Sequence, residues 1–442
     1  MSASCSREPR YQVICVCGGY GFPLGNASAA RITMIGRALQ EAGISFRVLH
    51  CGPSPTSINN KRAGTYEGIP FEYTTAVRRP DGKLARVLIY VWGLAGLTIR
   101  LLQVWPKRRL TIMYLYVMDG PINLYTGALC KWLGITIVQE LCEWVPVPSC
   151  SRFNAWLYRK RVFTAATGAL VISKAIEERV RKLAATTNPD LVVYRAPALV
   201  NSRRFAAACP APGSRTGDVP EFVYCGDHTR DVSFIIQALA FVKLSGYRCR
   251  LRIIGEYAEE AGPQLLRYGL EQGLSSGDLI MAKCVDHDHL ATLYKAATAL
   301  LMPLWNDEKS VTRLPNKMSE YLASGRPVIT SGIGDVTDYL TDNVNAYFAD
   351  PGDERRFAKK MIDVLDDPSR ATDIGMAGQE VCCTRLDYRA YVSALSRFFV
   401  HCIECECRRR LGCKARQRTL SGAYDPAQVS RVRTGADTAQ QE

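Results

Sequence analysis

Apolar runs and amphipathic stretches alternate along the first half of the chain. The run YQVICVC at 11–17 is followed by a glycine-rich segment, an amphipathic stretch, and a second apolar run, ISFRVLHCG, at 44–52. This order predicts a strand, a loop, a helix and a parallel strand. Further strand-like runs, separated by helical stretches, stand at 110–116, 135–140 and 169–173. Residues 1–205 are therefore predicted to form one doubly wound, Rossmann-like domain.

The segment at 206–219 differs from both of its neighbours because it is rich in proline, glycine and small residues. Such a composition is typical of a linker between two cores. A second alternating series fills 220–386, with strand-like runs at 222–226, 249–255, 278–284, 299–304, 327–331 and 345–349. We therefore expect an α/β fold of two Rossmann-like, doubly wound parallel-sheet domains that face a cleft. Ligands of such sheets bind at the carboxyl ends of the strands, which makes the cleft the expected site.

The end of the chain changes character twice. Residues 387–412 have a helical pattern and are predicted to pack back toward the N-terminal domain. Residues 413–442 are polar and poor in apolar side chains, which predicts a disordered tail.

One apolar run, VLIYVWGLAGLTI at 87–99, has basic residues on both sides. It has 13 residues, whereas a membrane-spanning helix needs about 20, so the run is not expected to span. An apolar patch ringed by cations suits the surface of an anionic bilayer. A buried core helix with solvated ends accounts for the same pattern equally well.

Charge narrows the choice of partners. The 442 residues include 56 basic and 42 acidic side chains, which gives a formal net charge of +14. An anionic partner is therefore expected: nucleic acid, a phospholipid surface or a phosphorylated small molecule. The basic residues are not interleaved with aromatic residues in a nucleic-acid-binding module, which argues against nucleic acid.

The 17 cysteines do not predict disulfides, because the chain is long and opens without a signal-peptide pattern. Reduced, cytosolic thiols are expected instead. The densest group, Cys402, Cys405, Cys407 and Cys413 beside His401, has no second ligand pair nearby. Structural zinc sites usually present two separated pairs, so we expect no metal.

The stretch TRLPNKMSEYLASGRPVITSGIGD, at 312–335, carries the candidate chemistry. Pro315 suits the first turn of a helix that ends at Gly325. Lys317 and Glu320 are three residues apart and so share one helix face. A lysine near a helix N-terminus is poor for an isolated helix but good for a bound phosphate, and Glu320 is placed to accept hydrogen bonds from ribose hydroxyls. The competing interpretation is an exposed ion pair without function.

This stretch resembles the signature of the family 4 glycosyltransferases, also called group 1, which are retaining enzymes of the GT-B fold. The segments FVYCGDHTRDVSFIIQALA, LRIIG and DYLTDNVNAYFADPGD resemble the neighbouring parts of the same family. In the first half, PLGNASAARITMIGRALQEAG and ALVISKAIEERV resemble the acceptor domain more loosely. The resemblance implies that residues 1–205 bind the acceptor and that residues 220–386 bind a nucleotide sugar.

Carried over to this sequence, the resemblance implies that Glu320 holds the ribose and that Lys317 contacts the diphosphate. Arg230 takes the position of a basic residue that stabilises the leaving phosphate, although a solvated loop arginine without a function is the alternative. Lys317, Arg230 and Glu143 are the catalytic candidates. The implied donor-binding set is Gly25, Asn26, Gly226, Arg230, Asn316, Lys317 and Glu320.

The sequence departs from the family at two places. Thr312 stands where the family often has a second carboxylate near the transferred sugar, and Glu308 is a candidate to replace it in part. Many members have a histidine after a strand like ITIVQE, whereas this chain has ELCEWVP. This leaves Glu140 or Glu143 for that position, and Glu143 is our candidate.

The expected function is that of a retaining glycosyltransferase, which moves a sugar from a nucleotide-sugar donor to a lipid-linked or saccharide acceptor in glycan or polysaccharide biosynthesis. No cofactor or metal is expected. An anionic membrane surface is a further expected partner, and the expected location is cytoplasmic, peripheral at the inner face of the membrane. The alternative is a catalytically silent nucleotide-sugar binder that serves a partner enzyme.

Overall fold

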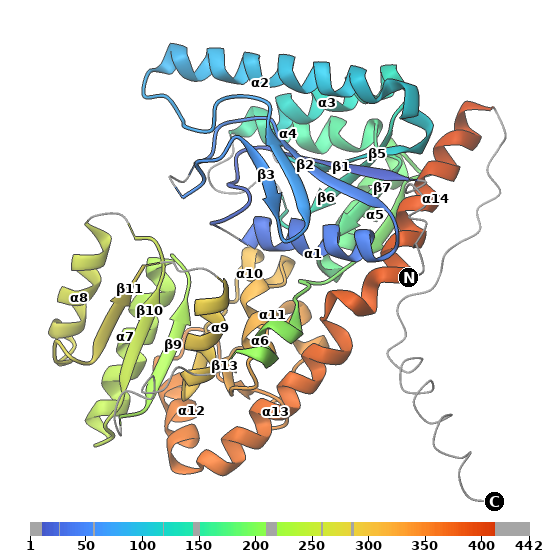
Figure 1. Cartoon of the computed structure of the whole chain (residues 1–442). Coiled ribbons are helices and arrows are strands. Elements are labelled where there is room, and N and C mark those ends of the chain that lie inside the picture. The colour runs from blue at the N-terminus through green and yellow to red at the C-terminus, as the bar shows by residue number, and fades with distance from the viewer. Residues whose placement is uncertain are drawn as a thin grey trace, which may run out of the picture.

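The computed structural model describes residues 11–25, 27–55, 58–117, 119–144, 151–208, 219–257, 260–283 and 287–411. Two parallel sheets form the centres of two α/β domains that lie one above the other in Figure 1. Most of the predicted linker and the predicted tail at 413–442 lie outside the described residues.

The N-terminal sheet has the strand order β3-β4-β2-β1-β5-β6-β7-β8. All neighbours are parallel except β3 and β4, which form an antiparallel hairpin at one edge. Strands β1, β5 and β6 are buried on both faces, as the mainly apolar sequences of β1 and β5 require. The strands are β1 Gln12–Cys17, β2 Ser45–His50, β3 Ala63–Tyr66, β4 Ile69–Tyr73, β5 Thr111–Tyr116, β6 Thr136–Leu141, β7 Gly168–Val171 and β8 Val192–Arg195.

Helices cover both faces of this sheet. Side-chain caps start two of them: the Asp119 carboxylate accepts a hydrogen bond from the Ile122 N–H, and Ser173 Oγ accepts one from the Ile176 N–H. The helices are α1 Ala27–Glu41, α2 Lys83–Val104, α3 Gly120–Leu133, α4 Arg152–Arg161 and α5 Lys174–Thr187, with short 3-10 helices η1 Trp105–Leu110 and η2 Val162–Thr164. The short helix α6 Ser202–Ala207 follows β8 and packs against helices of the second domain.

The C-terminal sheet is parallel throughout and has the order β11-β10-β9-β12-β13-β14. Its strands are β9 Glu221–Cys225, β10 Arg250–Ile254, β11 Leu279–Ala282, β12 Ala299–Met302, β13 Val328–Thr330 and β14 Tyr347–Phe348. Its helices are α7 Thr229–Leu244, α8 Ala261–Glu271, α9 His287–Ala296, α10 Glu308–Thr312, α11 Asn316–Ala323, α12 Glu354–Asp366 and α13 Pro368–Arg385, with η3 Gly334–Asp338. The predicted fold of two parallel-sheet α/β domains is confirmed.

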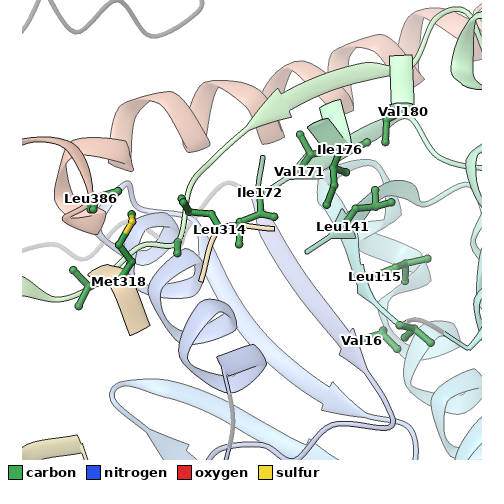
Figure 2. Close-up of a cluster of buried hydrophobic side chains, with 14 of the residues drawn as sticks. Val16, Leu115, Leu141, Val171, Ile172, Ile176, Val180, Leu314, Met318 and Leu386 are labelled. Carbon is green, nitrogen blue, oxygen red and sulfur yellow. The ribbon is translucent and has the colours of Figure 1, made fainter. Parts of the chain in front are cut away.

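A continuous apolar cluster joins the two domains. It runs from Val16 and Leu115 in the N-terminal sheet to Leu314 and Met318 near the start of α11. Figure 2 shows Ile172 between these two ends. Since the cluster crosses the domain boundary, hydrophobic burial itself holds the two domains together in this arrangement.

The last helix, α14 Val392–Arg410, follows the 3-10 helix η4 Tyr388–Tyr391 and returns to the N-terminal domain. Leu395, Phe398, Phe399 and Cys402 are buried against α1 and strands β5 to β7, in the same core cluster as Tyr114 and Val138. Figure 1 shows α14 continuing from the end of α13 up to the side of the N-terminal sheet.

A buried ion pair fixes α1 against the sheet. Arg31 Nε lies 2.9 Å from Glu140 Oε1, and both side chains are 1 % exposed. The same guanidinium donates to the carbonyl oxygens of Ala196 and Pro197, at the start of the crossover to the second domain. Tyr114 donates its hydroxyl proton to the second oxygen of Glu140. All the strong donors and acceptors are thus paired, which is what a buried charge requires.

Candidate functional site

The site lies where α11, the loop before α1 and the ends of β6 and β9 meet between the domains. Asn316 Nδ2 donates to the carbonyl oxygen of Ala27 over 2.7 Å, and Ser319 Oγ donates to that of Ala198 over 2.5 Å. Asn316 Oδ1 is enclosed and has no hydrogen-bond partner among the described residues. A buried acceptor without a partner is uncommon, and here it stands at the predicted donor site.

Lys317 lies on the first turn of α11 and reaches back across the end of β9. Its Nζ is 4.2 Å from the ring centroid of Tyr224, whose hydroxyl donates to Asp231 Oδ2 over 2.9 Å. A Cβ on Gly226 would stand 3.0 Å from Lys317 Nζ, so the glycine is what lets the ammonium approach the loop after β9. Burial lowers the pKa of Lys317, and the charge of Asp231 opposes that shift.

Glu320 follows one turn later and is half-buried. It lines a recess between the domains together with Thr33, Tyr66 and Glu67 from the first domain and Arg204 and His287 near the second. Burial raises the pKa of the Glu320 carboxyl, and the charges of His287, Arg204 and Lys317 oppose that shift only in part. The structure therefore holds a carboxylate and an ammonium close together, each in surroundings that disfavour its charged form.

Arg230 lies on the first turn of α7 and its side chain is 62 % exposed. Its guanidinium stacks over the Trp305 ring at 3.6 Å and pairs with Asp307 Oδ2 at 3.1 Å. Trp305 Nε1 donates to Asp231 Oδ1 over 2.8 Å. Since Tyr224 donates to the other oxygen of Asp231, this carboxylate links the residues around Arg230 to those around Lys317. The arginine is thus oriented by a defined set of partners, unlike a solvated loop arginine.

Glu143 follows β6 and faces the second domain. Its Oε1 lies 3.3 Å from Arg313 Nη1, two residues before Pro315. Burial and the charge of Glu143 both raise the pKa of the Tyr20 hydroxyl, which places Tyr20 of the glycine-rich loop beside this pair. Glu140, the other acid of the same stretch, is enclosed with Arg31 and faces no open space. Only Glu143 is therefore placed to meet a ligand between the domains; its catalytic role stays a prediction.

The glycine-rich loop before α1 supplies Gly25, which has a φ of 113°, a conformation that favours glycine. The bond from Asn316 to Ala27 brings this end of the loop to the start of α11. Asn26, also predicted to bind the donor, lies outside the described residues.

Thr312, at the position of the family's second carboxylate, is 3 % exposed. Its hydroxyl donates to the Glu308 carbonyl oxygen within α10, and its own carbonyl oxygen accepts a hydrogen bond from Ser173 of the first domain. The Glu308 carboxylate pairs with Arg179 at 2.6 Å. The Thr312 hydroxyl is thus used within α10, whereas the Glu308 side chain is 70 % exposed and only its Oε1 is paired, so a part replacement by Glu308 stays a prediction.

Several contributors to this site have no signal in the sequence motifs. Trp305, Asp231 and Tyr224 orient Arg230 and Lys317, while Arg313 pairs with Glu143. Arg313 alone could have been noticed, because it is a second cation just ahead of Lys317 in the stretch at 312–335.

Within the described ranges, no group of three or more histidine, cysteine, aspartate or glutamate side chains is arranged to hold a metal ion. Cys402 is buried in the core, Cys405 Sγ lies 3.4 Å from His401 Nε2, and Cys413 lies outside the described residues. That the protein works without metal stays a prediction.

The raised pKa of Glu320 predicts a stability gain on removing its charge. Because its folded pKa is raised above its unfolded value, the ionised carboxylate costs folding free energy at pH values above the folded pKa, and this cost disappears as the pH falls to its ordinary range. We expect Glu320→Gln to raise the free energy of unfolding by about 0.5–2 kcal/mol at neutral pH.

The measurement is the melting temperature of both forms across the acid range, where the advantage of Glu320→Gln should shrink as the pH falls. The exposed Glu380 of α13 offers the control, since Glu380→Gln should leave the melting temperature unchanged. A Glu320→Gln variant that is no more stable than the parent protein at neutral pH would contradict the expectation.

Comparisons with known proteins bear on the fold and on the family that the chain resembles. Residues 219–367 match the family model of glycosyl transferases group 1. A search of curated proteins gave no match. Among solved structures, the chain is similar to sucrose-phosphate synthase from Thermosynechococcus elongatus, with a TM-score of 0.69, 16% identity, and coverage of 89% of this chain and 99% of that one.

Two more solved structures have the same arrangement. HepE from Anabaena, in complex with UDP and glucose, gives a TM-score of 0.66 with 13% identity over 89% of this chain and 99% of its own. A glycosyltransferase from Rickettsia africae gives 0.64 with 13% identity over 90% and 99%. The fold is thus GT-B, as predicted, and the family match together with this fold supports the prediction of a glycosyltransferase.

Proposed function

We propose that the protein is a retaining glycosyltransferase that transfers a sugar from a nucleotide-sugar donor to a lipid-linked or saccharide acceptor. The observation that carries the proposal is the placement of Lys317 and Glu320 on adjacent turns of α11, with Gly226 against the ammonium and the first domain facing both. A diphosphate beside Lys317 would pair with the ammonium, and the hydroxyls of a ribose beside Glu320 would donate hydrogen bonds to the carboxylate.

The class of donor is supported by the neighbours. HepE was solved with UDP and with UDP-glucose in the same fold.

The proposed mechanism depends on charge stabilisation. As the bond from the sugar to the diphosphate breaks, positive charge develops on the sugar ring and negative charge on the leaving phosphate. Lys317, Arg230 and the free N–H groups at the start of α11 are fixed donors for that negative charge, so the reaction needs no metal. Retention of the anomeric configuration is proposed from the family resemblance. Glu143 is the proposed polar group on the acceptor side.

Thr312 favours a second candidate function. Its hydroxyl is bonded within α10, so this position offers the sugar no carboxylate. A protein that binds the nucleotide sugar without transferring it, in the service of a partner enzyme, is consistent with this feature.

A thermal-shift series with nucleotide sugars tests both candidates. A ligand at a hundred times its dissociation constant stabilises by about 2.7 kcal/mol, which raises the melting temperature by several degrees. We expect UDP or another nucleoside diphosphate and its sugar conjugate to produce this shift, and the double variant Lys317→Ala with Glu320→Ala to lose it.

The second measurement is release of nucleoside diphosphate in the absence of acceptor. Slow release from the stabilising donor supports the transferase, whereas stabilisation without release supports the silent binder. If no nucleotide sugar in a broad panel shifts the melting temperature, the donor site is wrongly assigned and both candidates fail.

A further inference from the structure

The first domain exposes an unusual amount of apolar surface on one side. Of 22 large hydrophobic side chains that are exposed in the described residues, 14 lie between residues 84 and 156. Four of the chain's six tryptophans are among them. We call this set the α2 face: Leu84, Val87, Leu88, Val91, Trp92, Ile99, Leu102, Trp105, Leu110, Leu124, Tyr125, Trp132, Phe153 and Trp156.

The α2 face belongs to neighbouring elements. Helix α2 packs beside α3, and α3 packs beside α4. The Thr98 and Tyr125 hydroxyls, 2.6 Å apart, join α2 to α3. Figure 1 shows α2 along the outer edge of the N-terminal domain with α3 next to it, on the side away from the second domain. Apolar surface of this extent on a folded protein usually marks an interaction site.

The charged residues of the same elements are all of one sign. The segments 83–110, 120–133 and 152–161 contain six, one and four basic residues and no acidic residue. By sequence, these segments therefore carry an excess of 11 positive charges, of which Arg100 is paired with Glu72 of β4. Lys107, Arg108 and Arg109 follow directly after Trp105 in η1, and Arg108 stacks on the Trp105 ring at 4.7 Å.

We propose that the α2 face docks on an anionic lipid bilayer, with α2 lying in the plane of one leaflet. Tryptophan and basic residues around an apolar helix face are the combination that favours the interface between headgroups and acyl chains. The proposal stands independently of the proposed sugar transfer, because it needs no property of Lys317 or Glu320.

The in-plane orientation follows from how α2 is held. Helix α2 has 22 residues, more than the 13-residue run suggested, and Lys83–Leu110 is long and apolar enough to cross a membrane. However, its opposite side is fixed to the domain. Ile89, Leu97 and Leu101 are buried in the core, Thr75 donates to the Ile89 carbonyl oxygen, and Thr74 donates to that of Gly93.

The glycines of α2 show how close this contact is. A Cβ on Gly93 would stand 2.2 Å from the Cys51 carbonyl oxygen, and one on Gly96 2.5 Å from that of Thr74. At this turn the helix therefore lies directly against the backbone that follows β2 and β4. At about 100° per residue, the exposed and buried sets fall on opposite sides of α2. To span a bilayer, α2 would have to leave this core.

A second copy of the chain fits the face less well than lipid does. A symmetric dimer through this surface would bring two clusters of like charge together, which is unfavourable, whereas an anionic leaflet complements the cluster. The expected docking strength falls as salt rises, because screening acts over about 10 Å at 0.1 M ionic strength.

The test is flotation of the full-length protein with vesicles of phosphatidylcholine, with and without phosphatidylglycerol. We expect binding to the anionic vesicles, release by salt, and quenching of tryptophan fluorescence by lipids with brominated acyl chains. The affinity of the double variant Leu88→Glu with Val91→Glu for these vesicles should be lower by a factor of roughly ten or more. Leu244→Glu, on an 81 % exposed leucine of α7 in the other domain, is the matched control and should bind normally.

Three results would overturn the proposal. Equal binding by the double variant and the control would exclude the α2 face. Resistance to alkaline carbonate extraction would indicate a spanning helix instead of an in-plane one. If the parent protein did not bind vesicles but formed a dimer in solution, and if the double variant were monomeric, the α2 face would be a contact between copies. Thermal shift with a nucleotide sugar checks that the double variant is folded, so a failure of docking is distinguishable from a failure of the donor site.

Discussion

Replacing Lys317 by alanine is expected to lower kcat by roughly a hundredfold to a thousandfold, with a smaller change in the KM for the donor. The ammonium is placed against Gly226 at the end of β9, where the proposed leaving diphosphate gains charge as the sugar departs. Removing one fixed donor to a developing charge has effects of about this size in other enzymes. An interaction that strengthens in the transition state is lost mainly from kcat.

Glu320→Ala serves as the comparison for this prediction. Hydrogen bonds to ribose hydroxyls are equally strong before and during reaction, so their loss should appear mainly as a higher KM. Lys182→Ala, on the exposed side of α5, is the control for a general charge effect. Steady-state kinetics provides the measurement, on variants that cooperative melting curves show to be folded. Unaltered kcat and KM in both site variants would return Lys317 and Glu320 to an ordinary helix pair.

The second large effect is expected at the buried pair of Arg31 and Glu140. Arg31→Met should lower the free energy of unfolding by about 3–5 kcal/mol, because it leaves the Glu140 carboxylate enclosed without its counter-charge. It also leaves the carbonyl oxygens of Ala196 and Pro197 without their donor. Denaturant unfolding followed by tryptophan fluorescence gives the measurement, and the effect should be large at neutral pH.

Two further variants isolate the cause. Adding Glu140→Leu to Arg31→Met should recover much of the loss, since no unpaired charge then remains. Arg181→Met breaks an exposed pair with Glu177 on α5 and should cost below about 1 kcal/mol. If the double variant were no more stable than Arg31→Met alone, the loss would come from packing of the long arginine side chain.

The fold could be predicted from the sequence because its main signal is local. Buried parallel strands such as β1 and β12 are short apolar runs, and the helices between them have amphipathic patterns. The apolar run at 87–99 is shorter than α2 for a related reason. An uninterrupted apolar run stops at Arg86 and Arg100, but the helix continues through both, since long basic side chains at its ends reach solvent.

The candidate site was only partly predictable because its geometry depends on contacts between distant residues. Glu140 and Glu143 stand three apart in one mainly apolar stretch, and nothing in the local sequence distinguishes their environments. Arg31, 109 positions earlier, encloses one, while Arg313, 170 positions later, pairs with the other. Likewise, the orientation of Arg230 depends on Trp305, which belongs to another strand's loop. The motif identified Lys317 and Glu320 because both lie on one short helix.

The return of α14 to the first domain has a consequence for how the protein is made. The ribosome completes residues 1–205 long before residues 392–410, yet Leu395, Phe398 and Phe399 belong to the core against α1 and the first sheet. Domains usually fold as they emerge, N-terminal first. Here the first domain must wait, with the apolar side of Tyr114 and Val138 uncovered, until the whole second domain has been synthesised. The nascent chain is therefore a natural client for chaperones, and a chain terminated early, just after α13, would lack a layer of its first domain even though its second domain was complete.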